Sequence, residues 1–127
     1  MKMLFMACPV LLAIAGLGTT SALADDAQAA VPPRQNLLEK QAQFGGVALT
    51  TKVAKVVFPE HYKTPLHTHE GPGPRYVVRG RIKIDEGGES RVYGPGEVFW
   101  ETGQWMYAEN VGQGEAELLV IELVAPK

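Results

Sequence analysis

From residue 47 onward, glycine and proline turns divide the chain into short segments with β-type patterns. Residues 47–58 are rich in valine and threonine, which strands favour. Residues 75–84 alternate, so that apolar side chains share one face and mostly basic side chains share the other. Turn signals follow at residues 86–88, 94–96 and 102–103. This pattern predicts an all-β fold, either a sandwich or a barrel, with no helix after residue 46.

The two ends of this β region have patterns of their own. Residues 118–124 form a nearly continuous apolar run, which predicts a strand buried on both faces. Residues 35–44 have a composition that allows one or two helical turns, and the glycine pair at 45–46 would end them. We therefore expect an extended or helical lead-in over residues 25–46, followed by one β domain over residues 47–127.

The first residues have the features of a secretory signal peptide. Lys2 gives a positive start, residues 4–17 form an apolar stretch, and Ala22 and Ala24 supply the small residues of a cleavage site. We expect a signal peptide over residues 1–24 and export to the periplasm or the medium. The apolar stretch is shorter than the about 20 residues of a membrane-spanning helix, so stable membrane insertion is not expected.

Cleavage after Ala24 would change the composition of the protein. It would remove Lys2 and the single cysteine, Cys8, and leave 11 basic against 14 acidic side chains. The mature protein would then have no disulfide and must rely on its core, on a metal or on a partner for stability. A mildly acidic balance gives no support for binding to nucleic acid or to an anionic membrane.

All three histidines of the chain fall within nine residues, at His61, His67 and His69. His67 and His69 are two residues apart in a stretch that has the pattern of a strand end, and side chains at this spacing point to the same face of a strand. Neutral imidazole is a common ligand for metal ions. The His67-Thr68-His69 sequence therefore predicts a pair of metal ligands.

The chain resembles the cupin superfamily over roughly residues 53–124. The first cupin motif is matched by residues 65–69 followed by 76–80, and the second by residues 94–99 followed by Gly103 and 110–112. The resemblance implies a small jelly-roll β-barrel, which frequently forms dimers, with a metal held in the barrel by four ligands.

Two of the four ligands implied by the resemblance are missing from this sequence. The position of the motif glutamate falls at Gly73, and the position of the second-motif histidine falls at Met106 or Tyr107. Only His67 and His69 remain, and zinc and iron sites usually have at least three protein ligands.

Other residues are candidates for the missing ligands. Glu70 follows the histidine pair directly, and is otherwise a solvated loop charge. His61 is a possible third imidazole, or a turn residue with a positive φ. Met106 would favour copper as a thioether ligand, although core methionines are commoner. The candidate metals are iron, manganese, copper and zinc.

We also predict a substrate pocket lined by Arg75, Met106, Tyr107 and Trp100. Arg75 would bind a carboxylate with its guanidinium, although the alternation around it favours a basic, solvated face. Tyr107 and Trp100 are alternatively packing residues, and Trp100 is also a candidate dimer contact, as is Trp105. Glu101 is expected to be solvated, with a spare-ligand role as the alternative.

The sequence thus predicts an exported cupin-like protein that binds a transition metal and a small molecule through His67 and His69. If the protein is an enzyme, the resemblance allows a metal-dependent oxygenase, isomerase or decarboxylase, because the fold does not choose the chemistry. The alternatives are a metal-free module that binds a sugar or carboxylate, and a dimeric structural or sensing domain whose pocket is filled by Met106 and Tyr107. A homodimer is the expected assembly.

Overall fold

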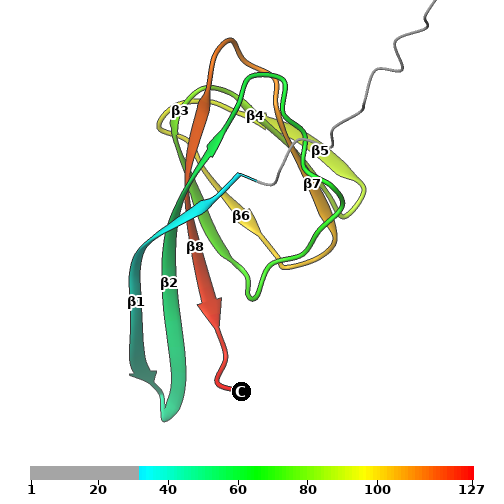
Figure 1. Cartoon of the computed structure of the whole chain (residues 1–127). Helices are drawn as coiled ribbons and strands as arrows, with labels where there is room; N and C mark the ends of the chain where they lie inside the picture. Colours follow the sequence, from blue (N-terminus) through cyan, green and yellow to red (C-terminus); the bar gives the residue numbers. More distant parts are fainter. Residues whose placement is uncertain (1–31) are drawn as a thin grey trace, which may run out of the picture.

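A computed structural model describes residues 32–127, which form eight strands in two antiparallel sheets (Figure 1). The strands are β1 (Arg34–Phe44), β2 (Val47–Phe58), β3 (Gly73–Arg79), β4 (Ile82–Glu86), β5 (Glu89–Tyr93), β6 (Val98–Glu101), β7 (Met106–Asn110) and β8 (Ala116–Val124). The predicted all-β fold is confirmed. The predicted signal peptide lies outside the described residues. Among residues 32–127, no helix is long and apolar enough to cross a membrane.

The two sheets face each other and enclose the core. The larger sheet has the strand order β1-β2-β8-β3-β6, and the smaller has the order β5-β4-β7. At the edges where β5 and β6 approach, Tyr93 stacks on Phe99 with ring centroids 4.4 Å apart. The core consists of Tyr62 from the loop between β2 and β3 and of side chains from the inner faces of both sheets: Val56, Phe58, Val77, Ile82, Ile84, Phe99, Met106, Ala108, Ala116, Leu118 and Val120.

Of the extended and helical forms expected for the lead-in, residues 35–44 take the extended one as part of strand β1, and the helical turns that their composition allowed do not form. It pairs with β2 from Arg34, opposite Val56, to Phe44, opposite Val47. The glycine pair at 45–46 has φ values of 57° and 80°, which suit the two-residue turn of a tight hairpin. Strand β2 offers hydrogen-bond partners along one edge of this segment, apart from the irregularity between Asn36 and Leu38, and this tertiary contact outweighs local helix propensity.

Strand β8 crosses the centre of the larger sheet and alternates strictly between its two faces. Ala116, Leu118, Val120 and Glu122 are buried on the inner face, whereas the residues between them are only partly buried. Within the single chain, β8 is therefore buried on its inner face only, and not on both faces as its apolar sequence predicted. The inner face also carries Glu122, a carboxylate in an otherwise apolar row.

Candidate functional site

The histidine pair lies in the loop between β2 and β3 rather than at the end of a strand. This loop runs beside β7 and is tied to it by backbone hydrogen bonds. The His67 amide donates to the Met106 carbonyl at 3.1 Å, and the Met106 amide donates to the His67 carbonyl at 2.9 Å. Nearer the start of the loop, the Thr64 amide donates to the Ala108 carbonyl. These bonds fix the loop against the small sheet and hold the two imidazoles between the sheets.

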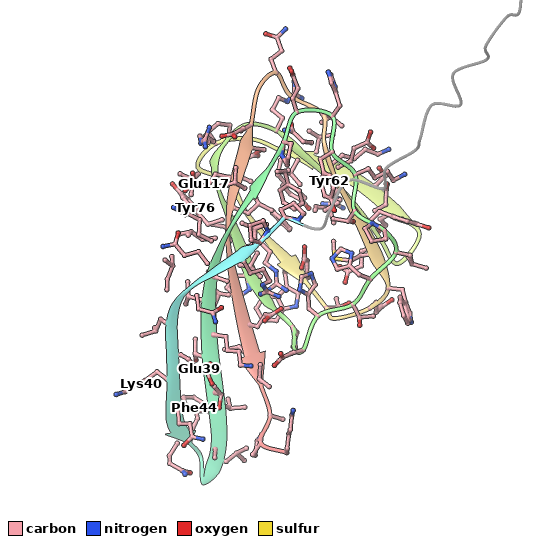
Figure 2. The ribbon with its side chains drawn as sticks, viewed as in Figure 1. Glu39, Lys40, Phe44, Tyr62, Tyr76 and Glu117 are labelled. Carbon is pink, nitrogen blue, oxygen red and sulfur yellow. The ribbon has the colours of Figure 1, made fainter. Side chains whose placement is uncertain are left out.

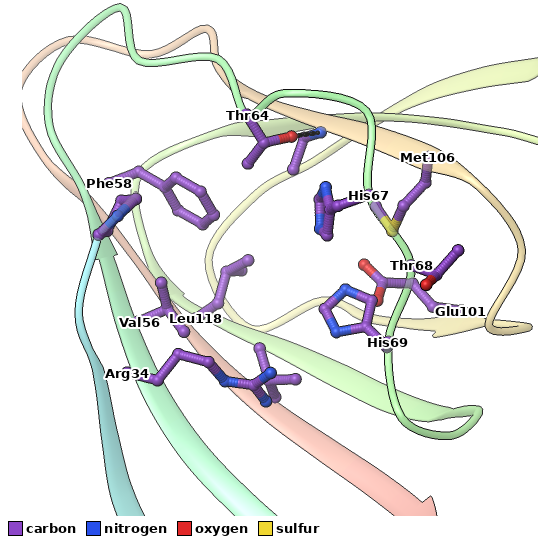
Figure 3. A pocket seen from close by; sticks show the side chains of 13 residues that line it. Arg34, Val56, Phe58, Thr64, His67, Thr68, His69, Glu101, Met106 and Leu118 are labelled. Carbon is purple, nitrogen blue, oxygen red and sulfur yellow. Dashed lines mark hydrogen bonds and ion pairs between the residues drawn. The ribbon is translucent and has the colours of Figure 1, made fainter. Parts of the chain in front are cut away.

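A cavity of about 170 Å³ opens between the two sheets beside the histidines. The imidazoles of His67 and His69 gather at one end with Glu101 and Met106, and apolar side chains lie at the other end (Figure 3). The apolar walls come from Val56, Phe58, Leu118 and Val120, and Pro32 and Arg34 also line the cavity. The cavity therefore combines an apolar chamber with a polar end.

Hydrogen bonds fix the orientation of both imidazoles. The Nδ1 of His67 lies 3.0 Å from the carbonyl oxygen of Pro65, and the Nδ1 of His69 lies 2.8 Å from Oε1 of Glu122. A carbonyl or carboxylate oxygen can only accept, so Nδ1 carries a proton in both rings. The ring centroids are 5.0 Å apart and the rings are nearly perpendicular.

His69 is the centre of a chain of alternating charges. Its Nδ1 contacts Glu122 and its Nε2 lies 3.1 Å from Oε2 of Glu101. Each carboxylate also contacts an arginine. Nη2 of Arg34 lies 3.1 Å from Oε2 of Glu122, and Nε of Arg75 lies 2.7 Å from Oε2 of Glu101, the same oxygen that faces His69. Buried charges are tolerated when they are paired and hydrogen-bonded in this way.

The surroundings of Glu122 hold it in the ionised form. Burial disfavours the charge, but hydrogen bonds from His69 and Arg34, together with their positive charge, prevail and lower the pKa of Glu122 from 4.5 to about 2. The carboxylate therefore accepts from His69 throughout the physiological pH range.

The solvated positions favoured for Arg75 and Glu101 are wrong, because both side chains are buried. The alternation that made Arg75 seem part of a basic face puts it on the inner side of β3, opposite Phe99 on β6. Arg75 binds a carboxylate as predicted, but this carboxylate is internal. Its Nη1 donates to the Ile121 carbonyl, and its Nη2 has no partner among the described residues.

The structure also explains why the motif glutamate is absent. A Cβ atom at Gly73 would overlap the carbonyl oxygen of Ile121 and would lie 3.2 Å from Nη1 of Arg75. Gly73 is paired across the sheet with Glu101 on β6, and directly opposed residues share a face. The carboxylate beside His69 therefore comes from the neighbouring strand.

Other predicted site residues lie away from the cavity. Glu70 is exposed and forms an ion pair with Lys52 at 2.6 Å, which lowers the pKa of Glu70 and raises that of Lys52. His61 is exposed with a φ of 63°, which agrees with the alternative prediction that it is a turn residue. Neither residue is brought to the histidine pair.

The four residues predicted to line the substrate pocket differ in whether they reach the cavity. Met106 is buried in the cavity wall next to His67. Tyr107 points elsewhere, and Nζ of Lys63 lies 4.8 Å from the centre of its ring. Trp100 is exposed and lies outside the cavity. Of the four predicted pocket residues, only Met106 lines the cavity, and Arg75 reaches the site through Glu101.

Sequence analysis missed Glu122 and Arg34. Glu122 did leave a signal, since it is the only charged residue in the apolar run at 118–124. Arg34 left none, because its position depends on the pairing of β1 with β2.

Two imidazoles and a carboxylate are the right kinds of donor for a transition metal. As the side chains stand, however, no three His, Cys, Asp or Glu groups within residues 32–127 converge as a metal site. These side chains are suitable metal ligands by type, but metal binding would require Glu101 and the two imidazoles to move closer to one another.

Comparison with known proteins identifies the family. A family model described as "Cupin domain" matches residues 54–122, which is more than half of the chain. The protein belongs to the cupin family. No curated protein is similar enough in sequence to match it.

Solved structures with the same fold include proteins of different kinds. A predicted oxalate decarboxylase from Thermotoga maritima has 17% identity and a TM-score of 0.50, over 71% of this chain and 94% of that chain. The cupin domain of an XRE family transcriptional regulator from Enterobacter cloacae has 12% identity and a TM-score of 0.59, over 76% and 99% of the two chains. An oxalate oxidase has 26% identity and a TM-score of 0.50, over 59% of this chain and 42% of that one. The likeness to the first two establishes the fold alone.

Proposed function

We propose that this cupin binds a transition metal ion and a small organic molecule in its cavity through His67 and His69. The observation that carries the proposal is the state of the two rings: each keeps its Nδ1 proton in a hydrogen bond to an oxygen acceptor. Histidines that bind metals characteristically donate their other ring nitrogen to a carboxylate or a backbone carbonyl. This arrangement leaves Nε2 of His67 to coordinate the ion, and Nε2 of His69 would coordinate it in place of its contact with Glu101.

Glu101 is the third ligand in this proposal. Its Oε2 lies 3.1 Å from Nε2 of His69, and two donor atoms bound at about 2.0–2.2 Å to one ion are roughly 3 Å apart. Two histidines and one carboxylate suit iron, and the thioether of Met106 beside them would favour copper; manganese and zinc remain candidates. When bound, the ion would supply Lewis-acid or redox chemistry at its open positions.

The remaining residues of the chain have supporting roles. Arg75 orients the Glu101 carboxylate by donating from Nε to Oε2, and Glu122 fixes the His69 ring. The apolar walls would hold the body of the organic molecule and exclude water. A cavity of about 150 Å³ accommodates a benzene molecule, so the ligand is a small one.

A small carboxylic acid is the best-supported ligand class. Arg34 lines the cavity and is partly exposed, and both of its terminal nitrogens contact Glu122, so a ligand carboxylate would share or take over this guanidinium. Arginine binds carboxylates with two parallel hydrogen bonds. The names of two similar structures also refer to enzymes of oxalate, a small acid. A decarboxylase or an oxygen-dependent enzyme acting on such an acid is the activity to assay first.

Export is part of the proposal. It rests on the signal-peptide pattern of residues 1–24, and the protein would then act in the periplasm or outside the cell.

A second candidate is a metal-free module that binds a sugar or a carboxylate. It is favoured by the charge chain from Arg34 to Arg75, in which both ring nitrogens of His69 already have carboxylate partners. In that case His67 and Arg34 would contact the ligand directly.

Metal titration of the chelator-treated protein separates the two candidates. Fe²⁺, Mn²⁺, Cu²⁺ and Zn²⁺ would be added singly, with elemental analysis and thermal unfolding as readouts. We expect about one ion per chain and a rise in melting temperature of roughly 10 °C near saturation. Binding should be lost in a His67→Ala, His69→Ala double variant, weakened in Glu101→Gln, and unchanged in Glu70→Gln, the matched control.

Two outcomes would overturn the metal proposal. One is that none of the four ions binds or raises the melting temperature. The other is that an ion binds equally well to the double variant, which would put the metal elsewhere. Either result would leave the metal-free module as the candidate, and calorimetry with small acids and sugars would then test it.

A further inference from the structure

A second hollow lies on the outer face of the smaller sheet, which points away from the histidine pair. Its volume is about 330 Å³, a size that suits a small molecule. We call it the outer hollow, and the lining residues that matter here are Leu66, Asp85, Glu89, Ser90, Trp105 and Tyr107. None of these six residues lines the cavity beside the histidines, so the outer hollow is a separate site.

Strand pairing explains why these side chains meet. Tyr107 on β7 is paired with Asp85 on β4, and Asp85 is paired with Ser90 on β5. Directly opposed residues share a face of the sheet, so the three side chains form one row. Trp105 precedes Tyr107 by two residues, and Met106 between them is buried on the inner face. Trp105 therefore reaches the same outer face as Tyr107.

The loop between β2 and β3 supplies the remaining wall of the outer hollow. At the start of this loop, Tyr62 lies beside the smaller sheet, to which its carbonyl is hydrogen-bonded (Figure 2). Further along the loop, the backbone bridge between His67 and Met106 puts Leu66 next to Tyr107. Leu66 is 48% exposed, so its side chain adds an apolar wall to the hollow rather than to the core.

Trp105 provides the aromatic ring that a ligand can reach. It is 65% exposed, whereas the neighbouring ring of Tyr107 already has a cation over it, because Nζ of Lys63 lies 4.8 Å from its centre. Apolar surface is unfavourable in water, and an indole ring is a large, flat surface on which the apolar side of a ligand can pack. The outer hollow thus has one open stacking position.

The acidic side chains of the outer hollow already have partners within the chain. Asp85 lies 3.6 Å from Nζ of Lys83, and Glu89 lies 3.4 Å from Nη2 of Arg91. Oε1 of Glu86 accepts two hydrogen bonds from the turn between β6 and β7. Because the negative charges are balanced or engaged in this way, the hollow offers hydrogen-bonding groups without a strong preference for a cation.

A sugar ring combines the two kinds of contact that the outer hollow offers. The flat sides of a pyranose carry C–H groups with a slight positive charge, which pack on the electron-rich face of an indole. Its hydroxyls both donate and accept, so they can pair with carboxylates and with a serine hydroxyl. A cationic ligand would need unbalanced negative charge beside the ring, and a protein partner would need about 800 Å² of surface rather than a hollow.

We propose that the outer hollow binds a saccharide, with one sugar ring stacked on Trp105 and its hydroxyls bonded to Asp85, Glu89 and Ser90. The ring belongs to a free sugar or to a polysaccharide chain, since both present the same C–H face and hydroxyls. This site does not depend on whether a metal binds to the histidine pair.

The test uses the fact that the chain has only two tryptophans. Trp100→Phe leaves Trp105 as the only indole, and Trp105→Ala leaves Trp100, which is also exposed but lies outside the outer hollow. Cellobiose, maltose and chitobiose, together with the five-ring chain of each series, would be titrated into each protein. Tryptophan fluorescence and calorimetry would measure binding, and circular dichroism would check folding.

We expect at least one sugar series to bind in the millimolar range and to change the fluorescence of Trp100→Phe, because one stacked ring and a few hydrogen bonds only slightly exceed the cost of association. Trp105→Ala should weaken binding roughly tenfold or more, and Asp85→Asn should weaken it several-fold. Glu109→Gln is the matched control, because Glu109 lies on β7 outside the hollow, and its binding should be unchanged. Affinity that rises with chain length would identify a polysaccharide, and equal affinity a free sugar; both support the proposal.

Three outcomes would overturn the proposal. One is that none of the sugars binds the unmodified protein. Another is that Trp105→Ala binds a sugar as tightly as the unmodified protein, which would put the sugar in the histidine cavity. The third is that choline, a quaternary ammonium ion, changes the fluorescence of Trp105 while the sugars do not, which would make the hollow a cation site.

Discussion

Replacing Glu122 by glutamine should reduce stability at neutral pH by an amount that the structure allows to be worked out. The pKa of Glu122 is about 2 in the folded protein, against 4.5 for a free glutamate side chain. At about 1.4 kcal/mol for each tenfold change in proton affinity, this difference corresponds to about 3 kcal/mol. Glutamine is nearly the same shape but carries no charge, so Glu122→Gln removes this contribution.

The direction of the pKa shift of Glu122 determines how its contribution to stability depends on pH. Because the pKa is lowered by folding, the contribution is complete above the unfolded-state value near 4.5, and it is lost as the pH falls through the folded value of about 2. Urea unfolding of the chelator-treated protein at a fixed protein concentration would measure both proteins from pH 7 down to pH 2. The free energies of unfolding should differ most at pH 7 and should converge towards pH 2.

Glu115→Gln is the control for this experiment. Glu115 also pairs with an arginine, Arg79, but both side chains are about half exposed. Such surface pairs contribute about 0–1 kcal/mol, so the control should stay close to the unmodified protein at every pH. If Glu122→Gln cost no more than the control at pH 7, or if its deficit persisted unchanged to pH 2, the argument from the charge chain would be refuted.

Two further predictions concern the missing ligand and export. Gly73→Ala should destabilise the protein by about 1–3 kcal/mol or more, because its Cβ would overlap the Ile121 carbonyl, and urea unfolding would measure this. Gly94→Ala, whose Cβ has ordinary contacts only, should cost less, and an equal cost at both sites would contradict the steric explanation. Expression in a bacterial host should yield a mature protein that begins at Asp25 in the periplasmic fraction, as determined by intact mass; a retained Met1 in the cytoplasm would contradict export.

The sequence by itself determined the fold class and the histidine pair. Alternation along residues 75–84 and the glycine and proline turns are local features, and a local pattern is sufficient to predict strands and hairpins. The turn at residues 86–88 joins β4 to β5 as expected. His67 and His69 are neighbours in sequence, so their closeness needed no tertiary information. The cupin motifs around them made the family recognisable.

Only the tertiary structure decided what surrounds the histidine pair. Glu122 lies 53 positions from His69 along the chain, and Arg34 reaches the site through a strand whose sequence also suits a helix. Glu101 was expected in solvent, because sequence pattern cannot tell which strand lies beside Gly73. The charged side chains around the histidine pair come from β1, β3, β6 and β8. They meet because sheet pairing joins distant segments, and the register of that pairing is set by burial of the whole core rather than by any one segment.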